Sequence, residues 1–442
     1  MKRKIYLSVF LLTFAITASS QFVPKPLNFP GTYYYPDVIS IVDHNHAWFG
    51  TIKGNSSGNL LPYPFAIHTN DGGETFVFDS IPAEGSPYIL DVSAVDSSIC
   101  YYAMTNSYQH WSIWKTTDGG NTWQKKTTTQ FEGGYLDVFY AFSADTGVAI
   151  GDPNLGSFEI QITNDSGNSW TRVPSANIPQ NQSGEYSWSY YHCALGNTIW
   201  FPTNKGRCFK SVDKGLHWTV STVLPPSTSA FDVRFASPDN GVFYPIMTGN
   251  RIYKTTDGGT SWVKDSIPLN ESVIFVSPVS GFNEGFVFTT TPDNILTDVY
   301  FTPDFFHTVV FIQSGMDLNG PVSFSDAETG WLTGSGTATD DIYYYTDVLT
   351  SVFAAAKTPE KLSIIPNPSA TEALVKLPSS LDSKSVQMLI IDMNGKVLEQ
   401  HAIASSTGWT KLNAGEYANG NYIVELVSGN QLVVSEKWVV NH

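Results

Sequence analysis

The chain has 442 residues, of which 42% are apolar, 14% aromatic and only 14% charged, with 35 glycines and 25 prolines. This composition is poor in the residues that build long helices, so it excludes an all-helical or coiled-coil protein. The formal net charge of −16 also excludes strong electrostatic attraction to nucleic acid or to anionic lipid.

Residues 1–20 have the pattern of a secretory signal peptide. Three basic residues at positions 2–4 precede an apolar run over residues 5–16, and small residues at 18–20 precede the expected cleavage site before Gln21. The apolar run is shorter than the roughly 20 residues that a membrane-spanning helix needs, and no later stretch is longer. We therefore expect an exported chain without a transmembrane segment.

A phrase of eight residues recurs along the chain, with Ser or Thr first, Asp third, Gly fifth, and Thr or Ser before a final Trp or Phe in most copies. Successive aspartates are 43 to 48 residues apart. The well-formed copies centre on Asp71, Asp118, Asp165, Asp213 and Asp257, and two degenerate copies centre on Asp304 and Asp347.

A second, weaker phrase precedes each copy and has the alternation of a β-strand that often begins with Asp-Val, as at Asp37, Asp91, Asp137 and Asp232. Together the two phrases define seven units, each with four short strands. A period of about 40 to 50 residues with four strands is typical of one propeller blade. Residues 22–356 are therefore predicted to form an all-β, seven-bladed β-propeller.

The eight-residue phrase resembles the Asp-box, also called the bacterial neuraminidase repeat, and residues 30–356 resemble the propellers related to photosystem II stability and assembly factors. The phrase is expected at the hairpin between the third and fourth strands, where the carboxylate accepts turn N–H groups and Gly supplies positive φ. We therefore interpret its aspartates as structural residues that brace the turn, and not as a catalytic set.

The composition changes after a linker predicted at residues 357–361, and residues 362–442 alternate as short strands with an Asn394-Gly395 turn, which predicts a small antiparallel β-sandwich. Pro366-Asn367-Pro368, Gly395-Lys396-Val397, Gly420 to Val424 and the final Lys437 to Val440 match, in order, the C-terminal sorting domain (type A) of the type IX secretion system of Bacteroidetes. This resemblance implies Sec export, recognition by the type IX machinery, and delivery to the cell surface or the medium.

Three cysteines are an odd number for an exported chain. Cys193 and Cys208 are expected on the first and third strands of one sheet, about 9.5 Å apart, which is too far for a disulfide. We expect three free, buried thiols.

Two loops that interrupt the repeat are candidate ligand sites, because function concentrates in irregular loops. Both are expected on the same face of the propeller. That face carries the loops that enter the first strands and the loops that join second strands to third strands. Their rings suit sugar stacking, although packing between blades is the alternative reading. The candidate residues are Tyr186, Trp188 and Tyr190 in one loop and Tyr108, His110 and Trp111 in the other.

The four Asp-Val aspartates share one register at the start of their strands. A ring of such carboxylates could hold Ca²⁺, and strand-entry capping is the alternative. The sequence indicates no other cofactor.

We expect a monomeric binding protein for a glycan or protein ligand, without catalysis. The alternative is a glycoside hydrolase with paired carboxylates on the propeller face. A sialidase is disfavoured, because the resemblance to that class implies an arginine triad and a Phe-Arg-Ile-Pro phrase before the boxes. The chain has no such phrase, and its mature part has only four arginines: Arg172, Arg207, Arg234 and Arg251.

Overall fold

A computed structural model gives the structure of the chain. It describes residues 22–27, 34–54, 60–61, 65–83, 87–106, 110–127, 135–189, 191–225, 230–291, 296–324, 329–334, 341–346, 362–376, 386–392, 396–402, 409–428 and 431–442. The signal peptide, the linker, the turn at Asn394-Gly395, and Asp347, Tyr108 and Tyr190 lie outside these residues. The chain divides into two compact units, Met1–Asp347 and Val348–His442.

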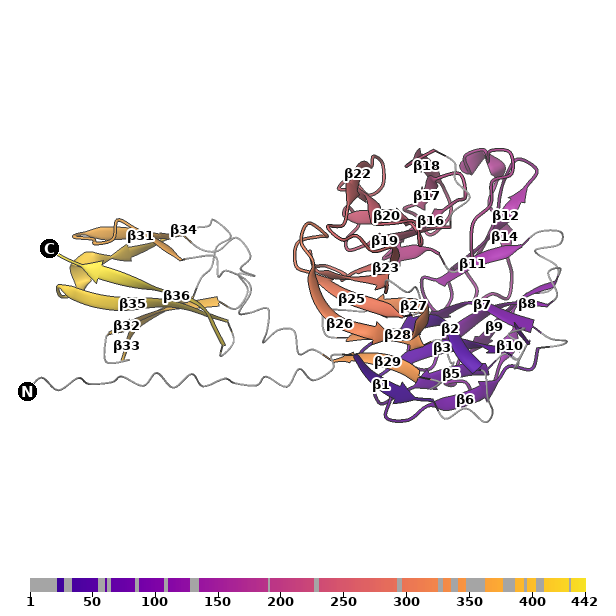
Figure 1. Cartoon of the computed structure of the whole chain (residues 1–442), viewed down its shortest axis with the longest axis horizontal. Coiled ribbons are helices and arrows are strands. Elements are labelled where there is room, and N and C mark those ends of the chain that lie inside the picture. Colours follow the sequence, from indigo (N-terminus) through magenta and orange to yellow (C-terminus); the bar gives the residue numbers. More distant parts are fainter. Residues whose placement is uncertain are drawn as a thin grey trace, which may run out of the picture. The chain divides into compact units, whose positions relative to one another are not determined.

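The first unit is a seven-bladed β-propeller, as predicted (Figure 1). Each blade is an antiparallel sheet whose first strand lies nearest the centre. The blades follow the chain in order, and their described strands have the following bounds. Blade 1 contains β2 (Tyr34–Ile41), β3 (Ala47–Gly54), β5 (Phe65–Thr69) and β6 (Val77–Ser80), with β4 (Leu60–Leu61) beside β3. Blade 2 contains β7 (Pro87–Ala94), β8 (Cys100–Asn106), β9 (His110–Thr116) and β10 (Gln124–Lys125). Blade 3 contains β11 (Leu136–Ala141), β12 (Gly147–Asn154), β13 (Ser157–Thr163) and β14 (Thr171–Arg172).

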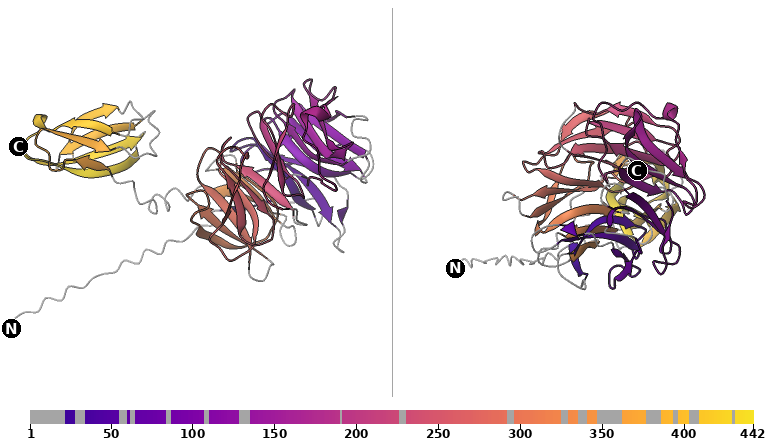
Figure 2. Two further views of the ribbon diagram at one scale, coloured as in Figure 1. Left: turned by 90° about the horizontal axis from the view of Figure 1, so that it is seen from above. Right: turned by 90° about the vertical axis from the view of Figure 1, so that its right-hand side faces the viewer.

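The remaining blades repeat this arrangement, and Figure 2 shows their ring from two further directions. Blade 4 contains β15 (Cys193–Leu195), β16 (Thr198–Pro202), β17 (Arg207–Ser211) and β18 (Thr219–Thr222), and a 3₁₀ turn, η1 (Ser175–Asn177), precedes it. Blade 5 contains β19 (Phe231–Phe235), β20 (Gly241–Pro245), β21 (Arg251–Thr255) and β22 (Val263–Ser266). Blade 6 contains β23 (Val273–Pro278), β24 (Gly285–Thr290), β25 (Thr297–Thr302) and β26 (Val310–Met316).

Blade 7 is assembled from both ends of the propeller segment. It contains β27 (Leu318–Phe324), β28 (Thr329–Gly334), β29 (Asp341–Thr346) and, as the outer strand, β1 (Phe22–Pro26). Strand β1 runs antiparallel to β29 from the pair Phe22 and Tyr345 to the pair Pro26 and Asp341. The two prolines of β1 suit an outer strand, because proline cannot donate to a further strand. This pairing closes the ring.

Aromatic and aliphatic side chains fill the spaces between neighbouring blades. Phe158 of blade 3 packs edge-on against Phe201 of blade 4, with the ring centroids 5.1 Å apart. Trp123, the last residue of an Asp-box, lies against Trp48 of the preceding blade. The repeated phrase therefore supplies part of the packing between blades.

The second unit is a β-sandwich of two sheets, as predicted. The smaller sheet contains β30 (Ser363–Ile365), β31 (Glu372–Lys376) and β34 (Trp409–Asn413), which a 3₁₀ turn, η2 (Ala414–Glu416), follows. The larger sheet contains β33 (Val397–Ala402), β32 (Val386–Asp392), β35 (Gly420–Ser428) and β36 (Gln431–Val440). Trp438 lies fully buried in the core of this unit, and its Nε1 donates to Ser369 Oγ at 2.6 Å.

Candidate binding site in the central channel and at its mouth

Each described Asp-box forms the hairpin between the third and fourth strands of its blade. In blade 2, Thr122 donates to both carboxylate oxygens of Asp118, from its N–H at 2.8 Å and from its hydroxyl at 2.7 Å. Thr116 Oγ1 donates to Asp118 at 2.9 Å and accepts the N–H of Gly120 at 2.9 Å. Equivalent bonds surround the other described box aspartates: Asp71, Asp165, Asp213, Asp257 and Asp304.

These contacts use the box carboxylates inside their own turns. Hydrogen bonds from Thr122 lower the pKa of Asp118, and those from Ser261 lower the pKa of Asp257 to about 2. Gly120 has a φ of +89°, whereas the degenerate sixth box has Phe305 and Phe306 at positive φ in the glycine positions. No box aspartate belongs to the channel described next.

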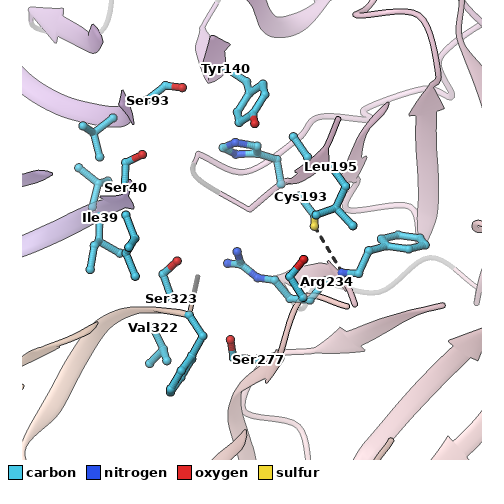
Figure 3. Close-up of a pocket in the computed structure, with 18 of the residues that line it drawn as sticks. Ile39, Ser40, Ser93, Tyr140, Cys193, Leu195, Arg234, Ser277, Val322 and Ser323 are labelled. Carbon is cyan, nitrogen blue, oxygen red and sulfur yellow. Dashed lines mark hydrogen bonds between the residues drawn. The ribbon is translucent and has the colours of Figure 1, made fainter. Parts of the chain in front are cut away.

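The inner strands surround a channel cavity of about 250 Å³ (Figure 3). Every blade contributes to its wall, and one residue from each blade in chain order is Ile39, Ser93, Tyr140, Cys193, Arg234, Ser277 and Val322. All three cysteines are free, and Cys193 is half-buried here, whereas Cys100 and Cys208 are buried. Its Sγ accepts the N–H of Phe235 at 3.4 Å, and burial raises its pKa to about 11, so the thiol is not activated.

Side chains of the inner strands connect neighbouring blades around this channel. Ser40 Oγ accepts the N–H of Ala94 at 3.0 Å, and Ser93 Oγ accepts the N–H of Ala141 at 2.9 Å. Asp91 likewise accepts the N–H of Phe139 in blade 3 at 3.0 Å. These hydrogen bonds connect the inner strands of blades 1, 2 and 3.

The Asp-Val aspartates occupy inner strands, but two of them do not start their strands as predicted. Strands β2 and β7 begin before Asp37 and Asp91, because the inner strands carry bulges at or next to these positions. Asp91 Oδ1 also accepts the N–H of Val92 at 2.9 Å, and Oδ2 lies 3.6 Å from His192 Nδ1. Burial raises the pKa of Asp91 to about 8 and that of Asp37 to about 6.

No three carboxylate, imidazole or thiolate groups converge as a metal-binding set within the part of the chain that the structure describes. Asp137 accepts a hydrogen bond from Ser187 Oγ at 2.6 Å. Burial and the neighbouring Asp152 carboxylate raise the pKa of Asp137 well above its usual range. Asp91, Asp137 and Asp232 thus accept hydrogen bonds from backbone or side-chain donors, and no metal-ligand set is found around them in the described residues.

Arg234 is the cation of the channel. Its Nε donates to Asp232 Oδ2 at 2.9 Å, and Tyr244 donates its hydroxyl to the same oxygen at 2.8 Å. Asp232 is fully buried and also accepts the N–H of Val233 at 2.8 Å. The sequence analysis missed Arg234 as a site residue, although a charged residue two positions after Asp232 in an apolar inner strand was the available signal.

The loop over residues 173–189, which we call the entry loop, lies at the end of the propeller where the inner strands begin, because Ser187 Oγ donates to Asp137 near the start of β11. We call this end the mouth of the channel. Tyr186 and Trp188 lie next to each other in this loop, with ring centroids 5.2 Å apart. Tyr186 is 37% exposed. Within the described residues, the Trp188 indole N–H is buried and has no hydrogen-bond acceptor.

In the second predicted aromatic loop, the structure describes the side chain of Trp111 among the three candidate residues. Trp111 is only 7% exposed and packs against Tyr135 within the layer between blades 2 and 3, with ring centroids 5.4 Å apart. His110 begins β9, and its side chain lies outside the described part. These contacts of Trp111 favour packing between blades, which was the alternative to sugar stacking.

Comparison with solved structures defines the class of the first unit. The chain is similar to YCF48 from Cyanidioschyzon merolae, with 15% identity, a TM-score of 0.53, and coverage of 73% of this chain and 99% of that one. It is similarly related to YCF48 bound to D1 peptide, with 16% identity, a TM-score of 0.51, and coverage of 74% and 97%. The first unit thus shares the β-propeller fold of these structures.

A curated protein is also similar in sequence to part of this chain. The chain is 24% identical over 182 residues to the chloroplastic photosystem II stability/assembly factor HCF136 of Oryza sativa subsp. japonica, which covers 40% of this chain. The match spans 41% of the length of that relative.

Residues 363–441 match the family model of the secretion system C-terminal sorting domain, so the second unit belongs to that family. The protein is therefore secreted or displayed at the cell surface through the type IX system. No helix in the described residues is long and apolar enough to cross a membrane.

Proposed function

We propose that this protein is a non-catalytic binding protein that takes a protein ligand at the mouth of its propeller channel. The observation that carries the proposal is the entry loop, which presents Tyr186 and Trp188 beside the inner strands. Buried hydrogen bonds hold this loop in place, so the rings are positioned before a ligand arrives. Such preorganisation reduces the entropic cost of binding.

Two exposed apolar residues on the same propeller face favour a protein ligand over a glycan. Leu155 is 90% exposed at the tip of the β12–β13 hairpin, and Met247 is 60% exposed between β20 and β21. Both have a φ of 56°, which is unfavourable for non-glycine residues. Non-aromatic apolar side chains at strained, exposed positions suit contact with a protein surface, because they lack the flat ring that stacks on a sugar.

The structural relatives support the same class of ligand. YCF48, whose propeller shares this fold, has been solved bound to a D1 peptide. We propose a protein segment as the ligand class here and make no assignment of its sequence.

The test is a binding screen of the purified full chain against peptide, protein and polysaccharide panels. We expect a protein or peptide ligand whose affinity falls at least tenfold when Tyr186 and Trp188 are both replaced by Ala. Val263→Ala, at an exposed position on the outer strand β22, is the matched control and should leave affinity unchanged. Binding only to polysaccharide, or undiminished binding by the double variant, would contradict the proposal.

A second candidate function is a glycoside hydrolase, which the neighbouring carboxyls of Asp137 and Asp152 favour. Burial raises the pKa of Asp152 to about 6, a value that suits a general acid near neutral pH. Release of reducing sugar from a polysaccharide panel, abolished by Asp152→Asn, would replace the binding proposal with this one.

A further inference from the structure

The channel contains a positively charged group whose hydrogen-bonding capacity is only partly used. Within the described residues, the only hydrogen bond of the Arg234 guanidinium is the one from Nε to Asp232. Its two terminal amino groups therefore have four N–H groups available. Figure 3 shows the guanidinium pointing into the cavity, with the hydroxyls of Ser277 and Ser323 on the same side.

The inner strands hold this arginine in a fixed orientation. Asp232 Oδ2 accepts both Arg234 Nε and the Tyr244 hydroxyl, and the latter accepts the N–H of Val276 in blade 6 at 3.1 Å. The side chain is thus anchored on the side that faces the protein. Its terminal amino groups remain on the side that faces the cavity.

The charge of the channel differs from that of the propeller. Residues 22–356 carry 32 acidic and 14 basic residues, which would repel anions at a distance. Inside the channel, however, burial keeps the Asp91 carboxyl largely protonated at neutral pH, with a pKa of about 8. Among the described residues, Asp232 is the one carboxylate in contact with Arg234. A ligand with one negative charge is repelled less by this carboxylate than a doubly charged phosphate is.

We propose that the central channel binds one carboxylate group, held by the terminal amino groups of Arg234 and by the hydroxyls of Ser277 and Ser323. A planar guanidinium matches a carboxylate through two parallel hydrogen bonds. Apolar neighbours, among them Ile39, Leu195 and Val322, surround the polar groups and suit a short hydrocarbon stem. A cavity of about 250 Å³ accommodates a group of side-chain or monosaccharide size.

This inference rests on the proposed binding function and names the chemical group that its channel recognises. The carboxylate can belong to an acidic amino acid or to a sugar acid. Titration calorimetry of the full chain with N-acetylglutamate α-amide, which has one carboxylate, and with glucuronate separates these sources. N-acetylglutamine α-amide, glucose and inorganic phosphate are the matched probes that lack a carboxylate.

We expect at least one carboxylate probe to bind, and its amide or neutral counterpart to bind at least tenfold more weakly. Arg234→Lys keeps a charge beside Asp232 but loses the planar fork, so it should weaken binding roughly tenfold. The double variant Arg234→Gln with Asp232→Asn removes both charges together and should abolish binding in a folded protein. Arg251→Gln, at an exposed arginine of the same blade, is the control that should change nothing.

Equal binding of carboxylate and amide probes, no binding of either carboxylate, or undiminished binding by the folded double variant would each overturn the inference. Suppose that a protein ligand found in the screen binds the Arg234→Gln, Asp232→Asn variant normally. This result would leave the proposed function intact and refute only the channel site. Carboxylate binding through Arg234 without any protein ligand would support the channel site and refute the proposed function.

Discussion

Arg207 of β17 holds Glu185 of the entry loop through two hydrogen bonds, from Nε to Oε1 at 2.9 Å and from Nη2 to Oε2 at 2.7 Å. Both side chains are buried, and Thr203 donates a further hydrogen bond to Oε1 at 2.6 Å. The backbone N–H of Gln182 donates to Oε2 at 2.7 Å. A single buried carboxylate therefore fixes the loop that carries Tyr186 and Trp188.

Glu185→Gln should reduce the free energy of unfolding by about 3–5 kcal/mol, because it leaves the Arg207 guanidinium buried without its counter-charge. Denaturant unfolding of the full chain measures the loss. The same substitution at Glu74, an exposed residue that pairs with Lys25 at 2.6 Å, is the control and should cost at most about 1 kcal/mol. Similar losses for the two variants would show that the buried pair does not hold the loop.

Thr116→Val tests the bracing role of the Asp-box. The buried hydroxyl accepts the N–H of Gly120 and donates to Asp118, so its removal should cost about 1–3 kcal/mol. Ligand affinity should stay unchanged, since the box lies at the end of the blade away from the channel mouth. Thr171→Val, at an exposed position of β14, is the stability control. Loss of affinity at unchanged stability would mean that the box contacts ligand.

Leu155→Asn should stabilise the propeller by about 1 kcal/mol, because Asn adopts positive φ more readily than Leu. The substitution should also weaken binding of a protein ligand, since it removes a side chain that is 90% exposed on the mouth face. Thermal unfolding and affinity measured on the same preparation test both effects. Leu155→Ala relieves no backbone strain and should therefore weaken binding without the gain in stability.

The repeat made most of the propeller predictable, because every well-formed Asp-box requires the same residues for the same turn. Closure by β1 was not predictable in this way. Phe22 and Tyr345 pair across more than three hundred residues, and the short β1 segment has no repeat phrase of its own. The fourth strand of the seventh unit was therefore expected after Asp347, within residues 22–356, whereas the outer strand of this blade is β1 from the N-terminal end of the propeller.

Candidate site residues were harder to predict than blades, because an aromatic ring in a loop and one between blades look alike in sequence. Trp188 and Trp111 illustrate this. Both lie beside small polar residues, yet only Trp188 belongs to a loop at the channel mouth. Arg234 was overlooked because its function depends on which inner-strand residues face the channel, and bulges near the Asp-Val positions change that register.

The stability of the propeller should be greatest in mildly acidic solution, near pH 5. The folded pKa of Asp91 is about 8 and that of Asp37 about 6, both above their unfolded value of 3.8. The folded state therefore retains protons that the unfolded state releases, and stability falls as pH rises from about 4 to about 8. The box aspartates have lowered pKa values, so their contribution is lost as pH falls below about 4.

Melting temperatures between pH 3 and pH 9 test this dependence. Asp91→Asn mimics the protonated carboxyl, so the variant should lose less stability than the wild-type chain between pH 5 and pH 8, by at most about 1.4 kcal/mol per pH unit. Asp239→Asn is a control on the surface of the same propeller. An unchanged pH profile in the Asp91 variant would show that this carboxyl is ionised in the folded protein.

Deletion of residues 362–442 should leave a folded propeller in the periplasm, because the two units have separate cores and the second carries the sorting domain. Fractionation and immunoblotting should find the wild-type chain at the cell surface or in the medium and the truncated chain inside the outer membrane.

Trp438→Ala provides a finer test. The indole is fully buried against Tyr417 and Tyr422, so its loss should destabilise the sandwich by about 3–5 kcal/mol and reduce export, while the propeller remains folded. Lys411→Ala, which removes only an exposed ion pair with Glu372, should be exported normally. Efficient surface delivery of the truncated chain would mean that the propeller contains its own export signal and that the sandwich has another role.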